Sequence, residues 1–354
     1  MSRILLFVLS LAIAGPGLAA SDVLHLYNWN NYIAPETVKR FEASCKCELK
    51  QTYYSDNEEL LAKLAAGAKG YDIVVPTGNA LESLIKQKKL MQIDKSKIPN
   101  LKNVNAAYLN TAFDPNNQYS VPYAYTITML GYNDQKMKEL GITVDSWAVI
   151  FDPKILEKIK GKVTVLDSSG ELMAAALKYL GYSINETDEK KLREAADLIK
   201  KAKPYWAAFN ASSYMKELTV GNIWVAHGYS NDIFQANLDA IAAGRKFRIL
   251  HALPKEGAVL ALDSMAILQS APRPDLAYKF IDFMLDGKNS AELSNLIGSG
   301  NPNSDAMQHI KADVRSNKAV FPDAATLAKL EQQKDFGAKD RRFRSRLWTE
   351  IKVR

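Results

Sequence analysis

Apolar strands and amphipathic helices alternate along this chain from residue 23 onward, and this order leaves few folds open. The first helix begins at Pro35, and the second is capped by Asp56 or Asn57 and ends at Gly67. The strands around them are predicted at Val23–Tyr27, Leu49–Tyr54 and Tyr71–Val75. A βαβαβ order predicts a mainly parallel sheet with helices on both faces.

The same order begins again in the second half of the chain. One helix opens at Gly170 and Glu171, and another follows Pro274 and closes at Gly287. The strands between them are predicted at Val163–Leu166, Ile223–Ala226, Phe247–Leu250 and Leu262–Leu268. Two such units predict an α/β protein with two lobes and a ligand cleft between them. We expect short extended crossings between the lobes near residues 131–133 and 257–262.

The first twenty residues have the three regions of a secretory signal peptide. Arg3 gives a positive start, Ile4–Ala14 is an apolar run, and a Gly-Pro-Gly turn leads to a cleavage site after Ala19 or Ala20. The run is shorter than the roughly 20 residues that span a bilayer. We therefore predict a signal peptide at residues 1–20, and no later stretch of sequence is apolar enough to cross a membrane.

Composition argues against several function classes. With 47% hydrophobic and 24% charged residues, the chain can bury a sizeable core. The net charge of +7 would suit nucleic acid, but the basic residues are mixed with acids, and the densest cluster, Lys339–Arg346, is predicted to be a solvated helix face. No nucleotide-binding glycine motif occurs and the four histidines lack metal-ligand spacing, so we expect no cofactor, no metal and no nucleic-acid partner.

The two cysteines, Cys45 and Cys47, leave three states open. With a single residue between them, a disulfide would lie near the upper limit of bridge geometry. Free thiols are the second possibility. A metal site, which would need further ligands nearby, is the third.

Motifs for catalysis are scarce. The sequence has no Gly-x-Ser-x-Gly elbow, and its histidines lie outside any nucleophile motif. Asp167 and Glu171, four residues apart at the predicted start of a helix, could serve a glycosidase, bind an ammonium group or stabilise the helix N-terminus. We expect no enzymatic activity.

Polar and aromatic side chains gather at the predicted strand ends, where open α/β sheets bind ligands. The candidate ligand-binding residues are Trp29, Asn30, Asn31, Tyr32, Thr77, Asp167, Glu171, Tyr229, Asp232 and Asp263. An enclosed alkylammonium group loses its hydration, at a cost of several kcal/mol unless carboxylates and hydrogen bonds replace the water. Aromatic faces add about 0.5–2 kcal/mol each by cation–π attraction. This mixture therefore predicts a site for an organic cation.

Seven runs of this sequence resemble one family, the periplasmic polyamine-binding proteins of ABC importers. The runs are Leu26–Val38, Tyr71–Pro76, Leu90–Lys97, Asp145–Trp147, Pro254–Ala258, Phe321–Asp323 and Arg346–Lys352. The resemblance implies the two-lobed type II periplasmic-binding-protein fold and a periplasmic monomer. It also implies delivery of a putrescine- or spermidine-like ligand to an inner-membrane permease. We expect lobe I at residues 21–131 and 259–304, and lobe II at residues 132–258 and 305–354.

The family's ligand positions carry over in part. The residues that match in type are Trp29, Tyr32, Glu171, Asp232 and Asp263. Thr77 replaces the usual Ser, and Tyr229 replaces a common Trp. Asn30 and Asn31 stand where the family has a hydroxyl residue and an acid. Ala261 and residues 297–300 lack an aromatic side chain that is expected there. Gly161 and Trp224 lie near the usual positions of the family's frequent disulfide, which is therefore expected to be absent. The resemblance thus implies a wider, less aromatic pocket that still prefers cationic amines.

The expected roles follow from residue type. Asp232 and Asp263 would neutralise ammonium groups, and Glu171 would hold the other end of a diamine or an internal amine. Trp29, Tyr32 and Tyr229 would line the alkyl chain. Asn30 and Thr77 would supply neutral hydrogen bonds. Three alternatives stay open: a receptor of the same fold for another small solute, a sensor, and a secreted enzyme.

Overall fold

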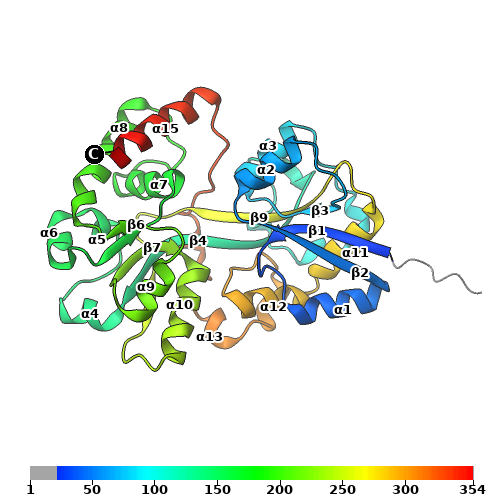
Figure 1. Cartoon of the computed structure of the whole chain (residues 1–354). Helices are drawn as coiled ribbons and strands as arrows, with labels where there is room; N and C mark the ends of the chain where they lie inside the picture. Colours follow the sequence, from blue (N-terminus) through cyan, green and yellow to red (C-terminus); the bar gives the residue numbers. More distant parts are fainter. Residues whose placement is uncertain (1–21, 354) are drawn as a thin grey trace, which may run out of the picture.

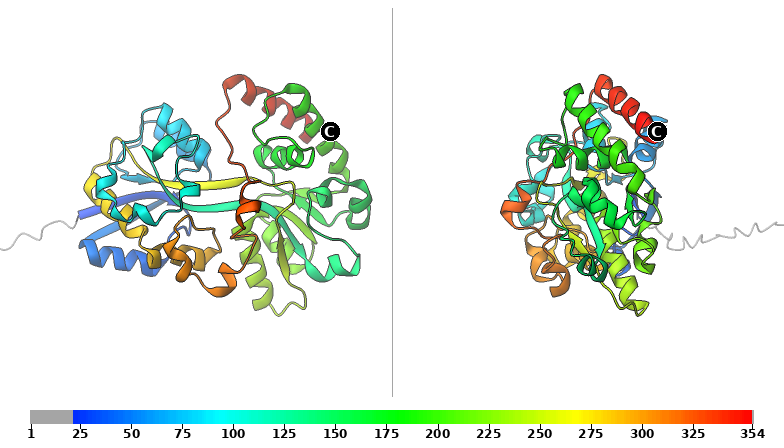
Figure 2. Two further views of the ribbon diagram at one scale, coloured as in Figure 1. Left: turned by 180° about the vertical axis from the view of Figure 1, so that it is seen from behind. Right: turned by 90° about the vertical axis from the view of Figure 1, so that its left-hand side faces the viewer.

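The structure, a computed structural model, describes residues 22–353, and the predicted signal peptide lies outside the described residues. The chain forms two lobes, and two extended segments run side by side between them (Figure 1). Helices lie around the strands of each lobe, and the C-terminal helix covers the lobe formed by the middle of the chain (Figure 2).

Lobe I is built on the first predicted βαβαβ unit. Its elements are β1 (Asp22–Trp29), α1 (Pro35–Cys45), β2 (Cys47–Tyr54), α2 (Asn57–Ala65), β3 (Ile73–Val74), α3 (Gly78–Lys86), α11 (Pro274–Met284) and α12 (Gly287–Ile297). β1 pairs in parallel with both β2 and β3. Pro35 opens α1, and Asp56 caps α2 as predicted. The prediction that Gly287 closes a helix is wrong, because Gly287 begins α12, which Asp286 caps.

Lobe II is built on the second unit. Its elements are α4 (Asp134–Glu139), α5 (Ala148–Phe151), α6 (Pro153–Leu156), β5 (Val163–Val165), α7 (Ser169–Tyr179), α8 (Glu189–Ala202), β6 (Ala208–Phe209), α9 (Tyr214–Val220), β7 (Val225–Tyr229), α10 (Ser230–Ala242), β8 (Ile249–Ala252) and α15 (Ala338–Val353). β5 pairs in parallel with β6 and β7. β7 and β8 both begin two residues later than predicted, so Tyr229 is the last residue of a strand.

The lobes are joined by β4 (Val121–Asn133) and β9 (Leu260–Ile267), which are antiparallel to each other. β9 also pairs with β3 of lobe I. β4 pairs with β9 as far as Ile127, and from Thr128 onward it pairs with β7 and β8 of lobe II. The sheet is therefore parallel within each unit and antiparallel where these two strands connect the units.

The last fifty residues contact both lobes. A small cluster of Ala291, Ala306, Ile310 and Val314 packs the segment after α12 against that helix, before the short helices α13 (Ala312–Arg315) and α14 (Ala324–Leu327). The chain then passes between the lobes and ends in α15, which packs on α7 and α8 (Figure 1).

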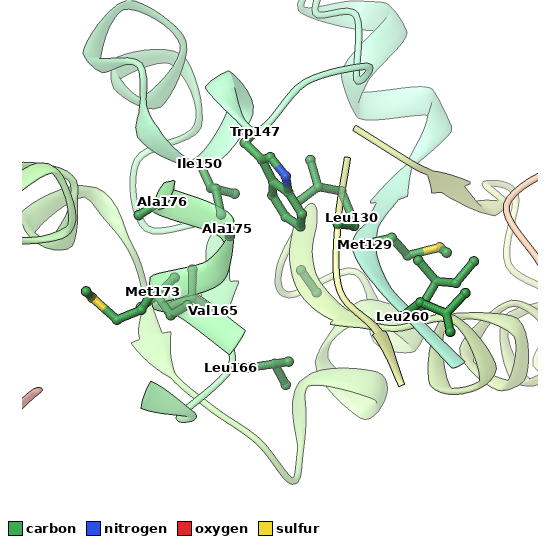
Figure 3. Close-up of a cluster of buried hydrophobic side chains, with 14 of the residues drawn as sticks. Met129, Leu130, Trp147, Ile150, Val165, Leu166, Met173, Ala175, Ala176 and Leu260 are labelled. Atoms are coloured by element: carbon green, nitrogen blue, oxygen red, sulfur yellow. The ribbon is translucent and has the colours of Figure 1, made fainter. Parts of the chain in front are cut away.

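The core of lobe II continues from β4 into α7 (Figure 3). Met129 and Leu130 of β4 contribute to it together with Val165 of β5 and Met173 of α7, all of them fully buried. Trp147 is buried in the same core, and its indole N–H donates to the carbonyl of Gly257 at 2.8 Å. Trp147 therefore belongs to the scaffold and not to the ligand site.

Cys45 and Cys47 form a disulfide, with their Cα atoms 5.2 Å apart. The bond joins the end of α1 to the start of β2. Of the three states left open by the sequence, the structure shows this one. Within residues 22–353, no helix has the length and apolar character to span a bilayer, and no cluster of three or more metal-binding side chains occurs.

Candidate ligand-binding site

Asp263 is one of the buried acids of lobe I. It lies in β9, where its backbone bridges to Thr77, just before α3. Its carboxylate accepts hydrogen bonds from the hydroxyl of Tyr32 at 2.6 Å and the hydroxyl of Thr77 at 2.7 Å. Thr77 occupies the N-cap position of α3 without a side-chain cap bond, which leaves its hydroxyl for Asp263. Burial raises the pKa of Asp263 to about 6, although the two hydroxyls favour its ionised form.

Trp29 and Tyr54 form an aromatic pair at the carboxyl ends of two parallel strands. They are in register across β1 and β2, and their ring centroids are 4.6 Å apart. The Trp29 indole N–H and the Tyr54 hydroxyl both donate to the carbonyl of Val75, at 2.9 and 2.5 Å. Burial and then the charge of Asp263 raise the pKa of Tyr54, so this aromatic pair lies near the acid. Tyr54 was not among the predicted site residues, although it ends a predicted strand.

Asn30 and Asn31 are exposed in the turn that follows β1. Asn31 has a φ of 55°, a left-handed conformation that Asn adopts more easily than most residues. Neither side chain has a hydrogen-bond partner among the described residues. Their contact with a ligand stays a prediction.

Glu171 is the buried acid of lobe II and lies in the first turn of α7. Ser168 caps that helix by accepting the backbone N–H of Glu171 at 3.4 Å. The Glu171 carboxylate accepts a hydrogen bond from the hydroxyl of Thr128 at 2.7 Å. Burial raises the pKa of Glu171 to about 7 against the opposing effect of this bond. Thr128 was missed because it lies inside β4 and not at a strand end.

Tyr214 joins two predicted residues, Tyr229 and Asp232. Its hydroxyl donates to the carboxylate of Asp232 at 2.5 Å and accepts the backbone N–H of Tyr229 at 3.1 Å. Burial raises the pKa of Asp232, which is partly exposed at the start of α10. The ring of Tyr214 packs on Gly228, where an added Cβ would lie 2.4 Å from a ring carbon. Tyr214 was not predicted as a site residue, because only folding brings α9 against β7.

Strand β4 sets the separation between the two halves of the site. Ala124 of β4 pairs with Asp263, and Thr128 pairs with Tyr229 while its side chain binds Glu171. Four residues of a strand correspond to about 13 Å at 3.3 Å per residue. The two buried acids are therefore held from one strand, on either side of the crossing between the lobes.

Acidic groups from both lobes lie near the Tyr229 hydroxyl. Burial raises the pKa of Tyr229, and the charges of Glu171, Asp232 and Glu58 raise it further. Glu58 lies in the first turn of α2 in lobe I, where the adjacent Asn57 accepts the backbone N–H of Thr77 at 3.3 Å. Glu58 was missed because the sequence assigns the start of α2 only a capping role.

Glu171, Asp232 and Asp263 accept hydrogen bonds from hydroxyl groups and have no cationic partner among the described residues. Among the ion pairs of residues 22–353, none includes Glu171, Asp232 or Asp263. A buried ion without a counter-charge is unfavourable by several kcal/mol, and an anionic guest would add to the repulsion. The arrangement therefore suits a guest that brings positive charge and N–H donors.

Asp167 differs from the other candidates. Its side chain is 42% exposed and forms an ion pair with Lys352 of α15 at 2.8 Å. Its contact with a ligand stays a prediction, and because Lys352 is its partner we expect Asp167 to contribute less to amine binding than the acids without a cationic partner. Of the two acids that the secreted-enzyme alternative needs, Asp167 is thus in an ion pair and Glu171 is buried.

Known proteins are similar to this chain over most of its length. Residues 36–322 match a family described as bacterial extracellular solute-binding protein. A putrescine/cadaverine-binding protein of Pseudomonas aeruginosa is 55% identical over 354 residues, which is the whole of both chains. The putrescine-binding periplasmic protein of Escherichia coli is 36% identical over 341 residues, covering 94% of this chain and 92% of its own.

Solved structures of known proteins share the fold of this chain. The spermidine/putrescine ABC transporter substrate-binding protein of Streptococcus pneumoniae superposes with a TM-score of 0.86 at 26% identity, over 94% of this chain and 99% of that one. A putative spermidine/putrescine ABC transporter from Listeria monocytogenes superposes with a TM-score of 0.82 at 28% identity, over 94% and 99% of the two chains. The predicted two-lobed fold is confirmed.

Proposed function

This chain belongs to the bacterial extracellular solute-binding protein family, and on that premise we propose that it binds a small organic polycation and delivers it to an ABC importer. The observation that supports the cargo is the set of three acids from both lobes, Glu171, Asp232 and Asp263, whose partners are neutral hydroxyls. The relatives named for putrescine, cadaverine and spermidine support the same chemical class.

Recognition of the guest would depend on the positive charges at both ends of its apolar methylene chain. Each carboxylate oxygen that accepts one hydroxyl bond keeps capacity for an ammonium N–H. Asp263 would hold one ammonium group from lobe I, and Glu171 with Asp232 would hold the other from lobe II. The rings of Trp29 and Tyr229 would lie along the methylene groups between them and add cation–π attraction.

Capture would require movement of the lobes about β4 and β9. Domain closure around a ligand usually takes place through a few residues where the chain crosses between lobes. β4 changes its partners between Ile127 and Thr128, which supports this part of the strand as one hinge. The lobe limits expected from the sequence remain part of this proposal.

The cellular setting is also part of the proposal. We place the mature protein in the periplasm, after cleavage of residues 1–20, as a monomer that docks on an inner-membrane permease. The E. coli relative that is named periplasmic supports this location. Binding without catalysis agrees with relatives that are named as binding proteins.

Isothermal titration calorimetry tests the cargo directly. Protein freed of bound amines by unfolding and refolding would be titrated with putrescine, cadaverine, spermidine, agmatine and neutral amino acids. We expect at least one polyamine to bind, and neutral amino acids to give no heat of binding. Binding of an amino acid with no response to any amine would show that the solute belongs to another class. Uptake of labelled amine, lost on gene deletion, would separate import from sensing.

A further inference from the structure

Residues 331–336 form a return segment that is attached to lobe II. Glu331 pairs with Lys178 of α7 at 2.9 Å. The side chain of Asn185 donates to the carbonyl of Gln332 and accepts the backbone N–H of Lys334, both at 2.9 Å. These contacts fix most of the return segment on the lobe that contains Glu171.

The end of the return segment is held by α15. The guanidinium group of Arg344 lies 3.9 Å from the ring centroid of Phe336. Arg344 is itself buried and donates to the carbonyls of Ile184 and Glu186, at 3.2 and 2.6 Å. Phe336 is therefore held against a side chain that is anchored in lobe II.

Asp335 is the residue of the return segment that contacts lobe I. Its carboxylate pairs with Lys86 of α3 at 3.1 Å and with Arg341 of α15 at 2.6 Å. Its backbone N–H donates to Glu82 of α3 at 2.9 Å, and Glu82 pairs with Lys86 at 2.8 Å. The row Lys86–Asp335–Arg341 thus joins a helix of lobe I to a helix of lobe II.

This connection involves the helix that follows Thr77 and the start of the helix that carries Glu171. α3 follows Thr77, which binds Asp263, and its last residue is Lys86. The return segment passes over the start of α7, where a Cβ added at Gly170 would lie 3.1 Å from the side chain of Gln333. Gly170 precedes Glu171 directly. Separation of the lobes would pull α3 away from α7 and must lengthen the Lys86–Asp335 pair.

We propose that Lys86 and Asp335 are positioning residues, whose ion pair stabilises the lobe arrangement that brings the two sets of acids together. The pair slows release of the guest and makes no contact with it. This inference relies on the proposed function for its guest, but not for its effect on the lobes. Since both pairs of Asp335 are partly exposed, each contributes modestly.

The test compares Lys86→Gln with Lys97→Gln. Lys97 pairs with Asp275 at the same distance of 3.1 Å, but both residues lie in lobe I, so this control removes an ion pair without disconnecting the lobes. We expect Lys86→Gln to raise the dissociation rate of a bound amine threefold to fivefold in stopped-flow measurements, and Lys97→Gln to leave it unchanged. The increase in dissociation rate should be equal for putrescine and spermidine, because on this proposal Lys86 contacts neither of them.

A second measurement requires no ligand. Small-angle X-ray scattering should give a larger radius of gyration for ligand-free Lys86→Gln than for wild type and Lys97→Gln, and Asp335→Asn should behave like Lys86→Gln. An unchanged radius and dissociation rate in both variants would overturn the inference. So would a rate effect that depends on amine length, since that indicates direct contact. If wild type binds no amine, the proposed function fails while the scattering comparison still decides the role of this ion pair.

Discussion

At the scale of single residues, each acid of the site is held by hydroxyl groups. Tyr32 and Thr77 donate to Asp263, and Thr128 donates to Glu171. A hydroxyl orients a carboxylate and favours its charged form without neutralising it. A Lys or Arg in the same place would satisfy the charge and leave nothing for a cationic guest. The hydroxyls therefore prepare the acids for a guest and keep their charge available to it.

Asp263→Asn should weaken polyamine binding at least tenfold, equivalent to about 1.4 kcal/mol. The amide keeps the shape of the side chain but loses the charge that would face an ammonium group. Calorimetry with putrescine and spermidine measures the effect. Asp167→Asn is the matched control, because that acid is paired with Lys352, and its affinity should equal that of wild type. Equal affinities for all three proteins would remove Asp263 from the site.

Polyamine affinity should fall as the pH is lowered from 8 to 5. In the free protein the pKa of Glu171 is raised to about 7 and that of Asp263 to about 6, so both acids gain protons across this range. An ammonium guest needs them ionised and must displace those protons, which weakens binding by up to about tenfold per pH unit for each acid below its pKa. Titrations at intervals of one pH unit should show a loss of at least tenfold overall. In Glu171→Gln the loss of affinity should begin about one pH unit lower. An affinity of the wild-type protein that does not change with pH would contradict a role for these two acids in binding.

The candidate acids were easier to find in the sequence than their hydrogen-bond partners. Glu171, Asp232 and Asp263 could be found because they stand near predicted strand ends or helix starts. Thr128 could not, because it lies in the middle of a buried strand and only its register with Tyr229 places it near Glu171. Tyr214 depends in the same way on how α9 packs. The ion pair of Asp167 could not be predicted either, because its partner, Lys352, is 185 residues away in the chain.

At the scale of elements, the contact between β7 and α9 supports one acid of the site. Gly228 lets the ring of Tyr214 approach the strand, so that its hydroxyl reaches both Asp232 and the backbone of Tyr229. A side chain at position 228 would occupy the space of the ring, and nearby elements are too well packed to absorb it easily.

Gly228→Ala should displace Tyr214 and weaken amine binding. We expect a loss of about 1–3 kcal/mol of unfolding free energy, typical of overpacking, together with at least a threefold loss of affinity. Urea denaturation and calorimetry measure the two effects. Tyr214→Phe separates them: it keeps the ring but removes the hydroxyl, so it should lower affinity with a smaller change in stability. Unchanged binding in both variants would show that Tyr214 does not support the site.

The elements themselves were predictable where local signals are strong. Pro35 and Asp56 start their helices as expected, and β1 and β2 lie close to their predicted positions. Of β4, only an extended crossing near residues 131–133 was expected. Nearly every residue of the strand is buried, so it lacks the alternation of a half-exposed strand, and a proline such as Pro122 is unusual in a central strand. Gly287 was misread because a glycine after an apolar helix usually ends it, whereas here Asp286 starts the next one.

At the scale of the whole molecule, the candidate site is formed by residues of both lobes. Asp263 is hydrogen-bonded by side chains of lobe I, and Glu171 lies in lobe II. The connections between the lobes are β4, β9 and the chain after α12 (Figure 1). The fold class and the presence of two lobes were predictable, since both follow from the repeated strand–helix order. The crossing geometry was not, because β4 had no signal of its own.

Saturating putrescine or spermidine should reduce the radius of gyration of the wild-type protein in small-angle X-ray scattering. The reason is that a guest bound to acids of both lobes favours the arrangement in which the lobes are closest. Asp263→Asn at the same amine concentration should show less compaction. Tight binding measured by calorimetry without any change in radius would mean that the lobes do not move.

The pairing of β4 with both β9 and β7 limits how this protein can adapt to guests of different length. Insertion of one residue between Ala124 and Thr128 would turn every later side chain of β4 to the opposite face of the sheet and take Thr128 away from Glu171. Adaptation to a longer or shorter amine must therefore use the reach of the terminal side chains, such as an Asp exchanged for a Glu, while the number of residues in the strand stays constant.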